Sequence, residues 1–96
     1  MPGNDLPPVS QQRPSAAITT VTIKDFTFSP SGLTIPKGMT VRWVNEDVTP
    51  HQIKGTGFES GVLETGGSYE FTFTEAGTYD YICALHPSMR GEVLVM

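Results

Sequence analysis

The stretch TYDYIC, residues 78–83, decides the fold class of this chain, because its aromatic residues recur at every second position. A period of two places Tyr79, Tyr81 and Cys83 on one face of a β-strand. A second strand is predicted at RGEVLVM, residues 90–96. Residues 84–89 are therefore expected to form a loop that joins the two strands at one end of a sheet.

The same period of two recurs through the sequence beyond residue 17. One or two strands are predicted at residues 18–28, and single strands are predicted at residues 33–35, 39–45, 51–54, 69–74, 78–83 and 90–96. The segments SPSG (29–32) and PKG (36–38) are typical of turns, and no convincing helical pattern occurs. Trp43, Phe71 and Phe73 are expected to pack in the core. Seven or eight short strands of this kind predict an all-β fold, an antiparallel β-sandwich.

Length and composition predict one domain with an N-terminal arm. The sequence has 96 residues, and residues 1–17 hold four of its eight prolines. Such a segment cannot bury enough surface to offset its ordering entropy, so we expect 1–17 to be a disordered Pro-rich arm and 18–96 to fold. A folding unit of about 80 residues is near the lower limit at which a hydrophobic core alone gives a stable fold. The single cysteine excludes an internal disulfide but leaves room for a stabilising metal.

The charge pattern excludes several classes of partner. The formal net charge is −4, and the few basic residues are scattered, so we expect no nucleic-acid binding. No apolar run approaches the length that spans a membrane, and no segment has the pattern of a signal peptide. We expect a monomer. If the protein is exported, its signal or anchor is not in this chain.

Three residues with metal-binding side chains lie close together in CALHPSM, residues 83–89. His86 and Met89 follow Cys83 at intervals of three residues, so a single turn of chain can bring them around one point. Pro87 favours an extended or turn conformation at His86. Thiolate, imidazole and thioether together suit copper in a trigonal site of two His and one Cys with a weak axial Met. The second histidine that such a site needs is His51, because the chain has only two histidines.

Other interpretations of these residues stay open at this point. A lone cysteine is usually a small buried apolar residue, and a lone methionine usually belongs to the core. Zinc competes for cysteine and histidine ligands, although zinc sites do not use a thioether. Each of these interpretations has to explain why every Cys and His of the chain lies at two loops that should converge.

At these residues the chain resembles a cupredoxin, a small type 1 blue copper protein of the amicyanin and plastocyanin group. TEAGTYDYICALHPSMRGEVLV resembles the ligand-loop half of that family, and FTFSPSGLTIPKGMTVRWVNEDVTPHQI resembles the half that supplies the other histidine. The resemblance implies an eight-stranded Greek-key sandwich over residues 18–96. It implies copper bound by His51, Cys83, His86 and, axially, Met89. The family usually has Asn where this chain has Gln52, so the tie that this Asn makes between the ligand loops is in doubt.

The resemblance also implies a function, which is one-electron transfer by Cu(II)/Cu(I) outside the cytoplasm, in the periplasm or an equivalent compartment. We expect His86 to be the electron port, with transient docking of a redox protein such as a c-type cytochrome, a dehydrogenase or an oxidase. The docking surface is expected near Pro50, Leu85, His86 and Pro87. Glu46 and Asp47 are candidates to orient a basic partner, and a solvated acidic loop without a partner is the alternative.

Three other functions are alternatives to electron transfer. An enzyme needs further metal ligands or a nucleophile–base pair, and both histidines are already assigned, so we expect no enzymatic activity. This chain could instead be the electron-relay domain of a larger copper enzyme. Copper delivery or storage is the second rival, and a purely structural sandwich is the third. A further hypothesis is that His86 protonates and leaves the metal on reduction, since metal and proton compete for one nitrogen.

Overall fold

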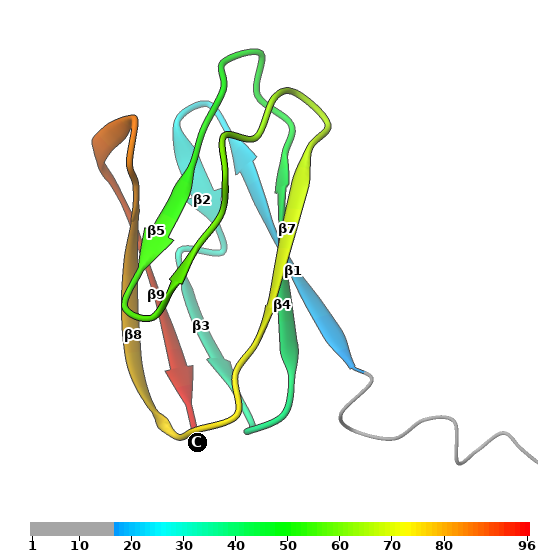
Figure 1. Ribbon diagram of the computed structural model, residues 1–96, viewed down its shortest axis with the longest axis vertical. Helices are drawn as coiled ribbons and strands as arrows, with labels where there is room; N and C mark the ends of the chain where they lie inside the picture. Colours follow the sequence, from blue (N-terminus) through cyan, green and yellow to red (C-terminus); the bar gives the residue numbers. More distant parts are fainter. Residues whose placement is uncertain (1–16) are drawn as a thin grey trace, which may run out of the picture.

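The computed structural model describes residues 17–96, which form nine strands (Figure 1). The strands are β1 (Ile18–Lys24), β2 (Thr27–Ser29), β3 (Gly32–Ile35), β4 (Thr40–Asn45), β5 (Ile53–Gly55), β6 (Phe58–Glu59), β7 (Ser68–Thr72), β8 (Gly77–Cys83) and β9 (His86–Val95). Within residues 17–96 there is no helix of the length and apolar character needed to cross a membrane. Ala17 belongs to the predicted arm and accepts a hydrogen bond from the Thr40 N–H. The rest of the arm, residues 1–16, lies outside the described residues.

The strands form two sheets that pack face to face, which confirms the predicted all-β sandwich. One sheet has the order β2-β1-β4-β7 and the other has the order β3-β9-β8-β5-β6. Both sheets are mixed rather than wholly antiparallel, because β1 pairs with β4 and β3 pairs with β9 in parallel. The period of two in the sequence tells which side chains face inward, but it carries no information on strand direction.

The core lies between the sheets and contains the aromatic residues that the alternation predicts. Trp43 and Phe73 are fully buried, and Phe71 is half-buried against them. The Trp43 ring stacks on Phe58 at 5.6 Å and meets Tyr81 edge-on at 5.3 Å. These rings connect both sheets, so the sandwich is held together by large apolar contacts rather than by hydrogen bonds between layers.

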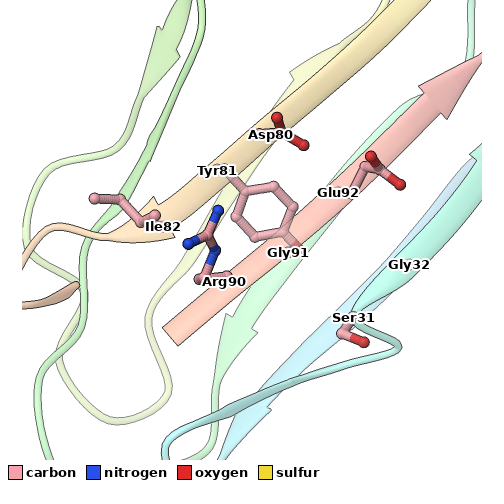
Figure 2. Close-up of a pocket in the computed structure, with 8 residues that line it drawn as sticks. All are labelled: Ser31, Gly32, Asp80, Tyr81, Ile82, Arg90, Gly91 and Glu92. Carbon is pink, nitrogen blue, oxygen red and sulfur yellow. The ribbon is translucent and has the colours of Figure 1, made fainter. Parts of the chain in front are cut away.

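A glycine on β9 makes room for the largest side chain of β8. Gly91 is paired with Tyr81, and a Cβ atom at Gly91 would lie 2.3 Å from the Tyr81 ring. Figure 2 shows the Tyr81 ring beside Gly91, in a shallow hollow on β8 and β9. The hollow is lined by Ser31, Gly32, Asp80, Tyr81, Ile82, Arg90, Gly91 and Glu92. None of these lining residues is a predicted metal ligand.

The connection between β8 and β9 is shorter than the predicted loop over residues 84–89. Only Ala84 and Leu85 turn the chain, because Cys83 already pairs with His86. The next pair is Ile82 with Arg90, so residues 87–89 form a bulge that has no partner on β8. Pro87 lacks an N–H group and is tolerated there because a bulged residue needs no ladder hydrogen bond.

The elements around His51 also differ in detail from the prediction. β5 begins only at Ile53, and His51 makes an isolated antiparallel bridge with Leu63. The chain then crosses to the other sheet between β6 and β7, through a glycine-rich stretch. Figure 1 shows the β1–β2 turn, the segment between β4 and β5, and the β8–β9 turn at the same end of the sandwich.

Candidate metal centre

Cys83, His51 and His86 come together at this end of the sandwich, as the sequence predicted. The ligand atoms of the three side chains all lie within 4.8 Å of one another. The Cys83 Sγ atom is 3.4 Å from His51 Nδ1 and 3.7 Å from His86 Nδ1. Two metal bonds of about 2.0–2.3 Å that meet at 110–120° place their donor atoms about 3.3–4.0 Å apart. The cluster therefore has the dimensions of a metal site.

The backbone explains why the three side chains converge. Cys83 and His86 end and begin neighbouring strands across a two-residue turn. Ile53 of β5 pairs with Cys83, the last residue of β8. His51 lies two residues before Ile53, so it is placed beside the end of β8. A hydrogen bond of 2.8 Å from the Ala84 N–H to the Gln52 carbonyl then holds the turn against the His51 segment.

The four predicted ligands differ in their exposure to solvent. Cys83 and His51 are fully buried, and Met89 has 5% of its surface exposed. His86 is half-buried and is the most exposed of the four. Met89 lies at the end of the β9 bulge and packs with the core cluster. Its role as the axial ligand stays a prediction.

The hydrogen bonds of His51 fix which of its nitrogens is free. Nε2 lies 2.9 Å from the Asp47 carboxylate, so a neutral imidazole donates its Nε2–H to Asp47 and presents the lone pair of Nδ1 to the thiol. The same Asp47 oxygen accepts the Phe26 N–H at 3.1 Å. The hydrogen bond from His51, and then that from Phe26, hold the pKa of Asp47 below its usual value.

Asp47 therefore has a different role from the one we expected from the sequence. Only 7% of its surface is exposed, so it is bonded within the site rather than free to orient a partner. Glu46 remains exposed. The only sequence feature that could have indicated the contact between Asp47 and His51 is their spacing of four residues. In a loop this spacing leads to contact only when other bonds hold the chain in a folded-back conformation.

Asn45 closes that loop. Its side-chain amide donates to the carbonyls of Thr49 at 3.0 Å and Leu63 at 2.8 Å, and its side-chain oxygen accepts the Asp47 N–H at 2.8 Å. Asn45 is completely buried. All three bonds hold the 45–49 segment in the conformation that brings Asp47 back to His51.

Gln52 does not tie the ligand loops together through its side chain. Its Nε2 donates to Glu59 at 3.0 Å and to the Ser60 carbonyl at 3.2 Å, both on the β6 side. The Gln52 backbone N–H instead donates to the Cys83 sulfur at 3.4 Å. The tie to the ligand turn is thus made by backbone groups of residue 52.

Comparison with known proteins identifies the family. A family model described as a cupredoxin-like domain matches residues 8–95. This chain belongs to the cupredoxin-like family. It is 38% identical over 95 residues to an amicyanin of Paracoccus versutus, an alignment that covers 92% of this chain and 72% of that protein. It is 35% identical to a plastocyanin of Scenedesmus fuscus, with 71% of this chain and 85% of that protein covered.

Solved structures agree with this assignment. A reduced single-substitution variant of amicyanin superposes on this cupredoxin-like chain with a TM-score of 0.80 at 33% identity, covering 84% of each chain. The family and the sandwich fold predicted from the sequence are thus confirmed.

Proposed function

We propose that this chain is a type 1 copper protein that carries single electrons between redox proteins. His51, Cys83, His86 and Met89 would hold the copper ion. The observation that carries this proposal is the buried thiol with two imidazole nitrogens, from His51 and His86, at 3.4 and 3.7 Å. Copper bound there supplies the Cu(II)/Cu(I) couple, and a soft donor set with a trigonal arrangement suits both states.

The residues of the chain hold these donors in place. Cys83 and His86 are joined by a two-residue turn, and His51 is fixed by its bridge to Leu63 and its hydrogen bond to Asp47. Little rearrangement is then available when the oxidation state changes. The Gln52 N–H group donates to the sulfur, which stabilises the thiolate and lowers its electron donation to the metal.

Electrons are exchanged through His86, since it is the ligand with the most exposed surface. Leu85, next to it, has 45% of its surface exposed, and Pro87 is exposed while Pro50 is half-buried. This small apolar surface suits a weak and transient redox partner. We propose a c-type cytochrome, a dehydrogenase or an oxidase as that partner, and an action outside the cytoplasm.

A carrier is favoured over an enzyme by the supply of ligands. The sequence contains two histidines and one cysteine, and all three lie in this one cluster. A second metal centre of the kind that copper enzymes need would require histidines that the sequence does not contain.

The visible spectrum of the copper-loaded protein tests the proposal. We expect an intense thiolate-to-copper charge-transfer band with one Cu(II) per chain, and reversible one-electron reduction. Cys83→Ser removes the thiolate and should abolish the band, whereas the matched control Ser88→Ala changes an exposed residue of the same segment and should keep it. A parent protein that binds Cu(II) without this band would exclude the type 1 site.

A further inference from the structure

The β1–β2 turn holds a bulky residue in a conformation that suits glycine. Lys24 pairs with Thr27, so Asp25 and Phe26 are the two turn residues. Their φ angles are +53° and +57°, in the left-handed region. A two-residue turn of this kind favours Asn or Asp first and Gly second, because a side chain at positive φ meets its own backbone. A phenylalanine held in this way points to a role outside the turn.

The Phe26 ring lies against both imidazole rings of the metal centre. Its centroid is 5.0 Å from that of His86, with 84° between the ring planes. It is 5.5 Å from that of His51, with 82° between the planes. Both arrangements are edge-to-face, in the distance range at which aromatic pairs attract. The two imidazole rings are 5.1 Å apart, so one phenyl ring contacts both members of the pair.

The backbone of Phe26 is bonded to the same centre. Its N–H group donates to Asp47 Oδ2, which also accepts from His51 Nε2. The Glu46 N–H donates to the Ile23 carbonyl at 2.8 Å, which joins the base of the hairpin to the same loop. The turn is therefore attached by its backbone to Asp47, which is hydrogen-bonded to His51, and it contacts both histidines through the Phe26 ring.

The exposure of Phe26 shows which side of the centre it covers. Its surface is 49% exposed, whereas His51 beneath it is completely buried. One side of the ring thus faces solvent while the other meets the imidazoles. A chelator that approaches from this side meets Phe26 before it reaches His51.

We propose that Phe26 is a positioning residue of the metal centre. Its ring fixes the orientation of His51 and His86 relative to each other and restricts access to the metal from the solvent. The part of this inference that concerns metal retention rests on the proposed copper function, whereas the part that concerns ring orientation does not.

Two variants separate the ring from the backbone of the turn. Phe26→Asn removes the ring but keeps the turn, because Asn tolerates the left-handed region. Phe26→Tyr keeps the aromatic ring. The control is Val48→Ala on the neighbouring 46–50 loop, where the side chain is 89% exposed.

The first readout needs no metal. In the metal-free protein, Phe26→Asn should remove the ring-current shift on the imidazole protons of both histidines, while Phe26→Tyr and Val48→Ala leave these NMR signals near their parent positions. Parent-like imidazole signals in Phe26→Asn would overturn the proposal, whatever the protein does with copper.

The second readout is the rate at which bicinchoninate captures Cu(I) from the loaded protein. Loss of groups that support metal ligands typically weakens a site 10–100-fold, so we expect capture from Phe26→Asn to be faster by about tenfold or more. Phe26→Tyr and Val48→Ala should release copper at the parent rate. A parent rate for Phe26→Asn would refute the retention role. A parent without the blue band would instead refute the proposed function and leave the NMR result to decide the role of the ring.

Discussion

Replacement of Asn45 by Ala tests whether the loop before His51 is held by one side chain. The substitution removes three hydrogen bonds, those to Thr49, Leu63 and Asp47. At about 0.5–1.5 kcal/mol for each bond, the loss amounts to about 1.5–4.5 kcal/mol. The Leu63 carbonyl still accepts the His51 N–H at 3.1 Å, so the ordinary net value applies to that bond. The buried Asp47 N–H loses the Asn45 acceptor, which places the expected cost in the upper part of this range.

The matched control is Thr65→Val, which removes a single hydrogen bond of 2.7 Å to the Asp47 carbonyl in the same loop. Its expected cost is about 0.5–1.5 kcal/mol. Both variants are measured by urea unfolding of the metal-free protein, because bound metal adds its own stabilisation. The midpoint should fall while the slope of the transition stays constant. The reasoning is refuted if Asn45→Ala loses no more free energy of unfolding than Thr65→Val.

Three further outcomes are expected. Gly91→Ala places a methyl group against the Tyr81 ring and should lower the free energy of unfolding by about 1–3 kcal/mol in a urea titration. The control Gly61→Ala, with no atom within 4 Å of its Cβ position, should have little effect in the same titration. Gln52→Ala should leave the blue absorption band unchanged, because the donor to the sulfur is the backbone N–H; a shifted band would mean that the side chain matters. Burial raises the pKa of Tyr69, so the stability contributed by its protonated phenol is complete below pH 10 and is lost as the pH rises further. Tyr69→Phe should reduce this alkaline loss when the free energy of unfolding is measured against pH.

The alternation of side chains allowed most of the core to be predicted from the sequence, and the residue types allowed the convergence of His51, Cys83 and His86 to be predicted. Tyr81 and Cys83 face inward as expected, and the inventory of one Cys and two His left few ways to build a site. The spacing of Cys83 and His86 could be interpreted because one short connection joins the two residues. These features depend on local periodicity and on residue types, which a single sequence contains.

The features that could not be predicted depend on contacts between distant segments. The alternation continues through KDFTF and therefore predicts a strand rather than a turn at Phe26. The role of Asp47 depends on closure of the loop by Asn45, a residue that gives no such signal in the sequence. The two-residue strand β6, Phe58–Glu59, lies in a glycine-rich stretch and is too short to show a period.

The bulge in β9 lies between the candidate metal centre and the part of β9 that pairs regularly with β8. A change in the length of the bulge therefore does not alter the register of the core strands. Six consecutive pairs, from Gly77–Val95 to Ile82–Arg90, align β8 with β9, and this ladder begins only after the bulge. Residues added or removed between His86 and Arg90 would change the distance and the facing direction of Met89 but would leave these six pairs, and the side chains that they bury, in place. The placement of Met89 relative to His51, Cys83 and His86 can therefore be varied through the length of one segment without the sandwich having to refold around it.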